Sequence, residues 1–122
     1  MPASKLSIVE RQVDDVTILA LSGEMLLDDG DLAYGRRIDE VIAAGRVKIL
    51  LDLADLSYID SSGVGMMAAT LKAVRARHGD IRLLRVSTKG QRILSLLKLR
   101  SLFELFDDEA MALKSFKWRP GF

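Results

Sequence analysis

The chain lacks cysteine and has little histidine, and these absences narrow what the protein can do. Without cysteine, the 122 residues can form neither a disulfide framework nor a thiolate nucleophile or zinc ligand. His78 is the only histidine, so a metal centre built from several histidines is excluded as well. No apolar run reaches the ~18–20 residues that span a bilayer, and residues 1–7 contain no hydrophobic signal region. We therefore expect a cytoplasmic protein without a metal ion or a cofactor.

The composition that remains is that of one folded domain. Apolar residues make up 49% of the chain and charged residues 29%, which is enough apolar content for a core and too much for a disordered chain. We expect a single domain over residues 1–122. Its last residues, 116–122, are aromatic and basic, and they form a tail that either packs locally or contacts a partner.

The charges are divided unevenly along the chain, although the net charge is only +1. Residues 1–60 hold 6 Lys or Arg and 12 Asp or Glu, whereas residues 61–122 hold 12 and 5. Such an asymmetry can place an acidic and a basic face on one molecule. Nucleic-acid binding is one interpretation of the basic half, and a solvated surface is the other. No zinc-finger spacing, RNA-binding aromatic motif or dense basic run is present, which favours the solvated surface.

Apolar periodicity predicts strands that alternate with helices after a first hairpin. The expected elements are strands at 7–12 and 16–22 around the Asp14-Asp15 turn, a helix after residues 28–31, a strand at 47–53, a helix at 62–78, a strand at 81–86, a helix at 91–99, a strand at 103–106 and a C-terminal helix after Asp107-Asp108. This order predicts an α/β fold with a mixed, mostly parallel sheet and about four helices.

Residues 55–65 carry most of the chemical information. We expect residues 54–60 to form a connection beyond the apolar strand, at the sheet edge where open parallel sheets bind ligands and partners. Ser61 or Ser62 then begins the helix, either as a plain cap or at an anion-accepting terminus. Gly63 and Gly65 destabilise the first helical turn, which suggests another reason for their presence. Without side chains, they either let a partner approach this turn closely or let the turn pack tightly on the sheet.

The run Asp60-Ser61-Ser62-Gly63-Val64-Gly65, preceded by Leu51–Ile59, resembles the signature of STAS domains. Residues 21–24, 86–87 and 92–94 resemble further parts of that family, and the nearest group is the bacterial anti-sigma-factor antagonists, or anti-anti-sigma factors. The resemblance implies that Ser61 is the phosphoacceptor. Ser62 is less favoured, because as the expected cap its oxygen would bond to the backbone. The resemblance also implies as partners an anti-sigma factor that is also a serine kinase, bound when Ser61 is unphosphorylated so that a sigma factor is released, and a serine phosphatase.

One feature departs from the family pattern. Members often carry an aspartate directly after a Gly-(Glu/Arg)-Leu run, near the phosphorylation site. Here the residues are Gly23-Glu24-Met25-Leu26, and the first acid follows at Asp28. Either the loop is longer in this chain or the acid is missing.

The residues indicate a substrate role for Ser61 and no enzymatic activity. A nucleophilic serine needs a base and an oxyanion hole. His78 comes 17 residues after Ser61. It therefore lies ~25 Å away along a helix that rises ~1.5 Å per residue. No Gly-x-Ser-x-Gly motif and no nucleotide-binding Gly-Lys-Ser/Thr loop is present.

The long helix has two faces of different character. One face is apolar and should meet the sheet, through Val64, Met67, Ala68, Leu71 and Val74. The opposite face carries Met66, Ala69, Ala73 and Ala76. This face either binds a partner or is a solvated surface on which alanine only favours the helix. With the resemblance, these patterns predict a partner-binding surface made of Asp60, Ser61, Ser62, Gly63, Gly65, Met66, Ala69 and Ala73. The alternative is a non-phosphorylated STAS scaffold subunit of a signalling or transport assembly, in which Ser61 is only a cap.

Overall fold

In the computed structural model, which describes residues 5–26 and 29–117, strands and helices alternate along the chain. The elements are β1 (Leu6–Val13), β2 (Val16–Met25), α1 (Asp29–Ala43), β3 (Lys48–Ile59), α2 (Ser61–Arg75), β4 (Asp80–Leu84), α3 (Thr88–Leu96), the 3₁₀ helix η1 (Arg100–Leu102), β5 (Leu105–Phe106) and α4 (Glu109–Lys117). One sheet has the order β1-β2-β3-β4-β5, with β1 antiparallel to β2 and the other pairs parallel. The predicted fold class is confirmed.

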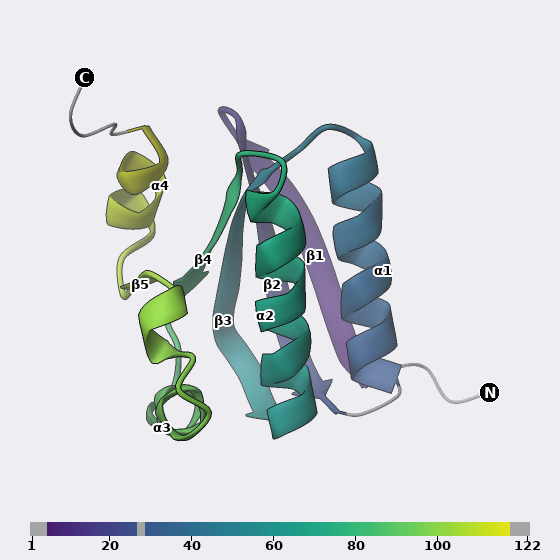
Figure 1. The fold of residues 1–122 in the computed structure, drawn as a ribbon, viewed down its shortest axis with the longest axis vertical. Helices are drawn as coiled ribbons and strands as arrows, with labels where there is room; N and C mark the ends of the chain where they lie inside the picture. The colour runs from purple at the N-terminus through teal and green to yellow at the C-terminus, as the bar shows by residue number, and fades with distance from the viewer. Residues whose placement is uncertain (1–4, 27–28, 118–122) are drawn as a thin grey trace.

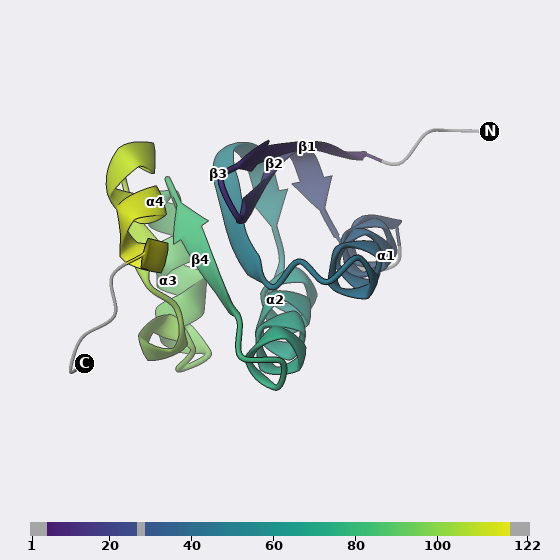
Figure 2. The same cartoon turned by 90° about the horizontal axis from the view of Figure 1, so that it is seen from above.

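The sheet separates two unequal layers (Figure 1, Figure 2). Helices α1, α2 and α3 contribute to the larger core on one face, and α4 packs on the other face. The central strands are buried on both sides: in β2, Ile18 belongs to the smaller core and Leu19 to the larger one, and neither is exposed. Leu50 and Leu51 divide in the same way in β3. The apolar run at 47–53 is therefore a central strand, as predicted.

Helices α1 and α2 bury the faces that the sequence indicated. Tyr34, Ile38, Val41 and Ile42 of α1 and Val64, Met67, Leu71 and Val74 of α2 all lie in the larger core. Ser87 caps α3 by accepting a hydrogen bond from the Gly90 amide at 3.0 Å, and Asp108 accepts one from the Met111 amide at 3.0 Å. The N-terminal signals of α3 and α4 were thus correctly located.

The expected connection at residues 54–60 is wrong. Strand β3 continues to Ile59 and pairs with β2 as far as Met25, with shifts in register after Ala20 and Gly23. Backbone pairing extends through Asp55, whose side chain is exposed, because a strand at the sheet's end tolerates polar side chains that face solvent. The carboxyl end of β3 therefore lies one residue before α2.

Other boundaries shift by a few residues where the backbone turns. Helix α2 ends at Arg75 and not at residue 78, and His78 has a left-handed φ of 65°. Gly79 follows, where a Cβ would lie 2.0 Å from the Val47 carbonyl oxygen. Arg85, with φ 58°, ends β4 before residue 86. Helix α3 spans 88–96 where 91–99 was expected, and β5 spans 105–106 where 103–106 was expected. Of the predicted tail at 116–122, Phe116 and Lys117 belong to α4, where Phe116 packs in the smaller core; residues 118–122 lie outside the described residues.

Within the part of the chain that the structure describes, no helix combines the length and the apolarity that crossing a membrane requires.

Candidate functional site

Ser61 is the first residue of α2, directly beyond the carboxyl end of β3. Its side chain is exposed, and among the described residues its hydroxyl has no hydrogen-bond partner. Figure 1 shows this end of α2 beside the arrowhead of β3. The site predicted from the sequence thus lies at the carboxyl edge of the sheet, where parallel sheets place their ligands and partners.

Asp60 caps α2, and neither serine does so as expected. The backbone of Asp60 is extended, with φ −100° and ψ −179°, and its side chain accepts a hydrogen bond from the Gly63 amide at 2.9 Å. An ionised carboxylate is a stronger acceptor for a helix N–H group than a neutral hydroxyl, which explains why the aspartate occupies the cap. The consequence is that the Ser61 hydroxyl is not needed for folding the helix.

Ser62 is held by carboxylates and not by the backbone. Its hydroxyl oxygen lies 2.7 Å from Asp31 Oδ2 and 2.8 Å from Asp60 Oδ1. The side chain is partly buried, in contrast to that of Ser61. Ser62 therefore links the first turn of α1 to the cap of α2.

Asp31 supplies an acid beside the site, and sequence reasoning missed it. It is only 6% exposed, and its Oδ1 atom is buried without a hydrogen-bond partner among the described residues. Asp28, the acid considered from the sequence, lies outside the described residues. A signal was available, because Asp31 shares the helical spacing of Tyr34 and Ile38, so the face that buries them also buries Asp31.

The two glycines have different roles. A Cβ on Gly63 would lie 2.8 Å from Ile59 Cγ1 and 3.1 Å from the Met25 carbonyl oxygen, so Gly63 packs the helix tightly on the sheet. A Cβ on Gly65 would meet nothing within 4 Å. Of the two alternatives left open by the sequence, tight packing applies to Gly63, and a bare surface applies to Gly65.

The α2 face formed by Met66, Ala69, Ala73 and Ala76 is only partly exposed to solvent. Ala69, Ala73 and Ala76 are exposed on α2. Met66 is half-buried and packs against the larger core, near Gly35 of α1. The exposed surface that continues from Ser61 is therefore formed by glycine and alanine, and Met66 supports it from the side of α1.

A hydrogen bond between α1 and α2 fixes the helices behind this surface. The Tyr34 hydroxyl lies 2.6 Å from Thr70 Oγ1, and both residues are buried. The Thr70 hydrogen is directed to the carbonyl oxygens of Met66 and Met67, at 3.1 and 2.9 Å, so Tyr34 is the donor. Burial raises the pKa of Tyr34 well above its ordinary value of 10.0.

A small groove adjoins the site on the α3 side. It has a volume of about 210 Å³ and is lined by the end of β3, from Leu53 to Ile59, and by the start of α3. The Lys89 ammonium lies 4.2 Å from the centre of the Tyr58 ring. The exposed surface around Ser61 therefore extends toward the amino-terminal turn of α3.

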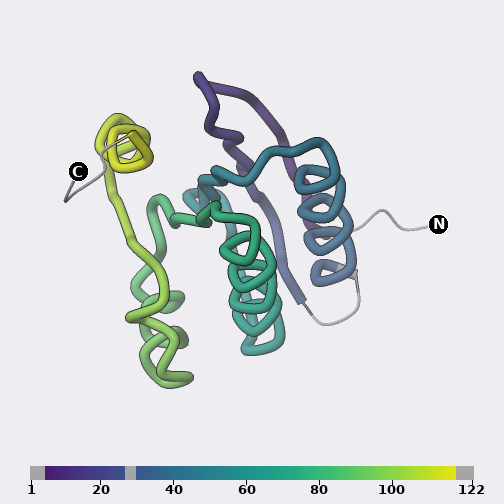
Figure 3. Tube along the Cα trace, turned by 45° about the horizontal axis from the view of Figure 1, so that its top comes forward, coloured from purple at the N-terminus to yellow at the C-terminus, as the bar shows by residue number. Residues whose placement is uncertain are grey.

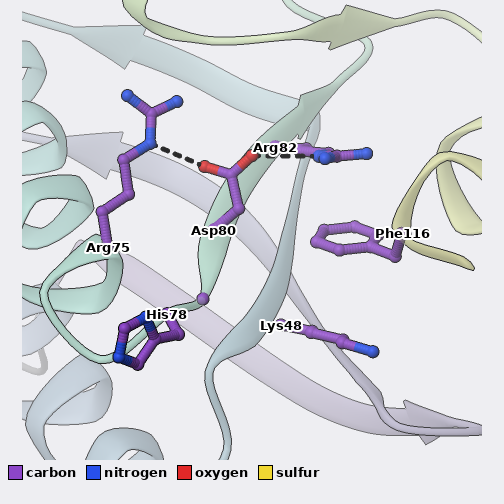
Figure 4. A pocket seen from close by; sticks show the side chains of 7 residues that line it. Lys48, Arg75, His78, Asp80, Arg82 and Phe116 are labelled. Carbon is purple, nitrogen blue, oxygen red and sulfur yellow. Dashed lines mark hydrogen bonds and ion pairs between the residues drawn. The ribbon is translucent and has the colours of Figure 1, made fainter. Parts of the chain in front are cut away.

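Another pocket, of about 530 Å³, lies at the other end of the sheet (Figure 4). It holds Lys48, Arg75, His78, Asp80, Arg82 and Phe116, but its cations are engaged within the protein. Asp80 bridges Arg75 and Arg82, at 3.0 and 3.1 Å, and Lys48 pairs with Asp15 at 2.5 Å. The Arg82 guanidinium also stacks on the Phe116 ring, 4.5 Å from its centre. We interpret this cluster as a structural network.

Acid–base chemistry at Ser61 has little support in this geometry. His78 lies beyond the far end of α2, and the carboxylates of Asp60 and Asp31 contact the neighbouring Ser62. In the described residues, no group of three or more His, Cys, Asp or Glu side chains is arranged to hold a metal ion.

Comparisons with known proteins agree on one family. The STAS domain model matches residues 7–112. An anti-sigma factor antagonist of Thermotoga maritima, so named provisionally, is 34% identical over 101 residues, which cover 81% of this chain and 89% of that protein. The anti-sigma F factor antagonist of Paenibacillus polymyxa is 29% identical over 99 residues, covering 80% and 84%.

Solved structures show the same fold. A crystal structure of a Thermotoga maritima protein, provisionally named an anti-sigma factor antagonist, superimposes with a TM-score of 0.83 and 28% identity, covering 91% of this chain and 95% of that one. SpoIIAA, an anti-sigma factor antagonist solved in its unphosphorylated form, gives 0.79 at 21% identity and covers 91% and 96%. Its phosphorylated form gives 0.72 at 22% identity and covers 89% and 98%.

Proposed function

Because this chain belongs to the STAS domain family, we propose that it is an anti-sigma factor antagonist whose binding is switched off by phosphorylation of Ser61. The observation that carries the proposal is the exposed Ser61 hydroxyl at the start of α2, unengaged while Asp60 caps the helix. Relatives that cover most of the chain are named as anti-sigma factor antagonists. The protein then acts in the cytoplasm as a binding module and not as an enzyme.

Ser61 is a better phosphoacceptor than Ser62 on three counts. It is exposed, whereas Ser62 is partly buried. Its hydroxyl has no hydrogen-bond partner among the residues that the structure describes, whereas the Ser62 hydroxyl lies within 2.8 Å of two carboxylates. A phosphate on Ser62 would face the charges of Asp31 and Asp60 directly, and like charges at that distance repel. A kinase can therefore modify Ser61 without disturbing the cap.

The binding surface consists of Ser61, Gly65, Ala69 and Ala73, which are exposed along α2. Gly65 leaves the first turn bare, so a partner can approach the Ser61 hydroxyl closely. Asp60, Ser62 and Gly63 hold this turn from beneath, and Met66 supports its flank. In this proposal the partner is an anti-sigma factor that is also a serine kinase, a sigma factor is released on binding, and a serine phosphatase restores the unmodified form.

The switch follows from charge at the contact. A phosphate adds about −1.5 to −2 charges at pH 7. Within the domain its cost is small, because the amino end of a helix favours negative charge by ~0.3–1 kcal/mol, although the neighbouring Asp60 opposes part of this gain. Against a partner surface shaped for a neutral hydroxyl, the same phosphate must be desolvated, which costs several kcal/mol. Each ~1.4 kcal/mol is tenfold in affinity, so the complex dissociates while the fold remains.

Calorimetric titration of the cognate anti-sigma factor tests this proposal. We expect Ser61→Asp to weaken binding at least ~100-fold, which corresponds to ~2.7 kcal/mol, and Ser61→Ala to bind but to resist phosphorylation. Ser7→Asp, which adds the same charge at an exposed serine of β1, is the control and should bind normally. Intact-mass analysis after incubation with the kinase should show one phosphate on the wild type and none on Ser61→Ala.

Two results would contradict the proposal. Equal affinities of wild type and Ser61→Asp would show that charge at Ser61 does not control binding. Absence of phosphate from Ser61 after kinase treatment would favour the non-phosphorylated scaffold.

A further inference from the structure

Part of the positive charge in the second half of the chain is concentrated on α3 and the residues that follow it. From Ile81 to Phe103 the sequence contains six Lys or Arg and no Asp or Glu. Four of these cations lie on α3 and the turn that follows it. We define the α3–η1 surface as the exposed side chains of Arg92, Leu96, Leu97, Lys98, Arg100 and Leu102. In Figure 1 and Figure 3 these elements lie on the flank of α2 that faces away from α1.

Three leucines of this surface are exposed to solvent. Helix α3 buries only Gly90 and Leu94. Leu96 is 74% exposed, Leu97 41% and Leu102 38%, although burying such side chains is favourable. Single exposed leucines are ordinary, but these three fall within seven residues around the end of α3, and clustered apolar exposure is typical of interaction sites.

The cations of the surface have no ion-pair partner among the described residues, whereas several cations on α2 and around β4 are paired. Arg75, Arg82 and Arg85 all form ion pairs with aspartates. In the part of the chain that the structure describes, Arg92 and Arg100 form no ion pair and no hydrogen bond through their side chains. Lys98 likewise has no carboxylate within 4.0 Å. These charges are available to an external group.

Lys98 occupies a backbone position that favours glycine. Its φ is 59°, in the left-handed region, and its amide donates to the Ser95 carbonyl at 3.0 Å. The next amide, of Leu99, donates to the Leu94 carbonyl at 2.8 Å, which completes a helix end where glycine is the usual residue. A lysine here strains the backbone, and its exposed side chain forms no ion pair among the described residues, so the charge has no evident role within the fold.

We propose that the α3–η1 surface binds an acidic amphipathic segment of a partner protein. Its leucines contact the apolar face of that segment, and its three cations contact the carboxylates beside that face. This surface and its occupant do not depend on the role of Ser61.

Other occupants match the surface less well. A second copy of the chain offers one strongly exposed leucine on α1, Leu32, among charges of mixed sign at Arg36, Arg37, Asp39 and Glu40. Nucleic acid would leave the leucines without an apolar partner, since its interfaces are mostly polar. A membrane needs a larger apolar face, because interfacial binding scales with the apolar area inserted and Leu97 and Leu102 are more than half covered.

Amide NMR titration of the full chain with defined probes tests the proposal. The main probe is a helical peptide with leucine along one face and glutamate beside it, and its control has lysine in place of each glutamate. We expect shifts confined to residues around α3 and η1 with the acidic peptide only. Vesicles of phosphatidylglycerol and phosphatidylcholine, duplex DNA and a concentration series of the protein alone test the other occupants.

Matched variants locate the binding energy. Combining Arg92→Gln, Lys98→Gln and Arg100→Gln should weaken binding of the acidic peptide at least ~10-fold, because these three cations supply the attraction to its carboxylates. Arg36→Gln, Arg46→Gln and Lys114→Gln combined remove three exposed cations elsewhere and should leave its affinity unchanged. Lys98→Gly separates binding from folding. It should raise the melting temperature, because glycine suits the left-handed backbone, and still lower the affinity for the acidic peptide.

The proposal is overturned by any of three outcomes: no shift with the acidic peptide, equal affinity of the two triple variants, or stronger effects from vesicles, DNA or self-association than from the peptide.

Discussion

At the scale of single residues, the hydroxyl of Ser62 has one hydrogen for two carboxylates. It lies 2.7 Å from Asp31 Oδ2 and 2.8 Å from Asp60 Oδ1, and it can donate to only one of them at a time. Asp31 is also buried, with its second oxygen unpartnered among the described residues. The fold therefore accepts an unfavourable arrangement at this point, beside the proposed phosphoacceptor.

We predict that Asp31→Asn stabilises the protein. The amide supplies a hydrogen that Ser62 or Asp60 can accept, and it removes a buried carboxylate whose unsatisfied oxygen costs ~1–3 kcal/mol. The loss of a favourable charge in the first turn of α1 costs only ~0.3–1 kcal/mol. The free energy of unfolding, measured with urea, should rise by ~0.5–2 kcal/mol.

Two variants serve as controls for this prediction. Asp39→Asn neutralises an exposed carboxylate on the same helix and should change stability by less than ~0.5 kcal/mol. Asp31→Ala removes the partner of Ser62 without replacing it and should be less stable than Asp31→Asn. A lower stability of Asp31→Asn than of the wild type would show that the carboxylate is favourable in its present place.

At the scale of the element, the first turn of α2 holds two glycines with opposite requirements. We predict that Gly63→Ala destabilises the protein by ~1–3 kcal/mol, because its Cβ would come within 2.8 Å of Ile59 and 3.1 Å of the Met25 carbonyl oxygen. Gly65→Ala should stabilise it by ~0.5–1 kcal/mol, because the new methyl meets nothing within 4 Å and alanine favours helix. Thermal denaturation of both variants checks the pair.

The effect of Gly65→Ala on binding should be opposite to its effect on stability. Gly65→Ala adds a methyl group to the bare surface beside Ser61, so the more stable variant should bind the anti-sigma factor more weakly. Stability and affinity that both rise would place the partner away from this turn.

The elements themselves were largely predictable from the sequence, and their ends were not. Apolar periodicity located β2, α1 and α2 because each buries a regular face. The end of β3 was missed because its last residues are held by backbone pairing with β2, and side-chain polarity does not report that pairing. The end of α2 was missed because the close approach of Gly79 to Val47 is a tertiary contact.

The position of the candidate site could be predicted from the sequence, but its hydrogen bonds could not. The position of Ser61 at the start of a helix beyond a buried strand followed from the order of the elements. That Asp60 and not a serine caps α2 depends on which of three adjacent oxygens reaches the Gly63 amide. The acid beside Ser62 comes from Asp31, 31 residues earlier, and only the packing of α1 on α2 brings the two together.

At the scale of the whole molecule, the proposed binding surface and the ion-pair network around Asp80 lie at opposite ends of the sheet. Ser61 and the start of α3 lie at the carboxyl ends of the strands. The ion-pair network around Asp80 lies at the opposite ends of β3 and β4. Between them, the buried hydrogen bond from Tyr34 to Thr70 joins α1 to α2 within the larger core. Changes to the exposed residues Ser61, Gly65, Ala69 and Ala73 of the proposed surface should therefore leave both the network and this hydrogen bond in place.

Tyr34 makes the stability of the whole domain depend on alkaline pH. Burial raises the pKa of its hydroxyl above the ordinary value of 10.0, so the folded state keeps the proton that the unfolded chain releases. Above pH ~10 the unfolded state binds fewer protons, and the free energy of unfolding falls by up to ~1.4 kcal/mol per pH unit from this group; below that pH the group contributes no slope.

We predict that Tyr34→Phe removes this part of the alkaline slope. At neutral pH the variant should lose ~0.5–1.5 kcal/mol, because Thr70 no longer receives a hydrogen bond from α1. Between pH 10 and 11 the deficit should shrink or reverse, since the wild type then loses stability that phenylalanine cannot lose. Urea denaturation at closely spaced pH values measures both curves, and Tyr58→Phe is the control, because Tyr58 is the only other tyrosine and the residue is 39% exposed. Parallel curves for the wild type and Tyr34→Phe above pH 10 would show that Tyr34 ionises as readily in the folded protein as in the unfolded chain.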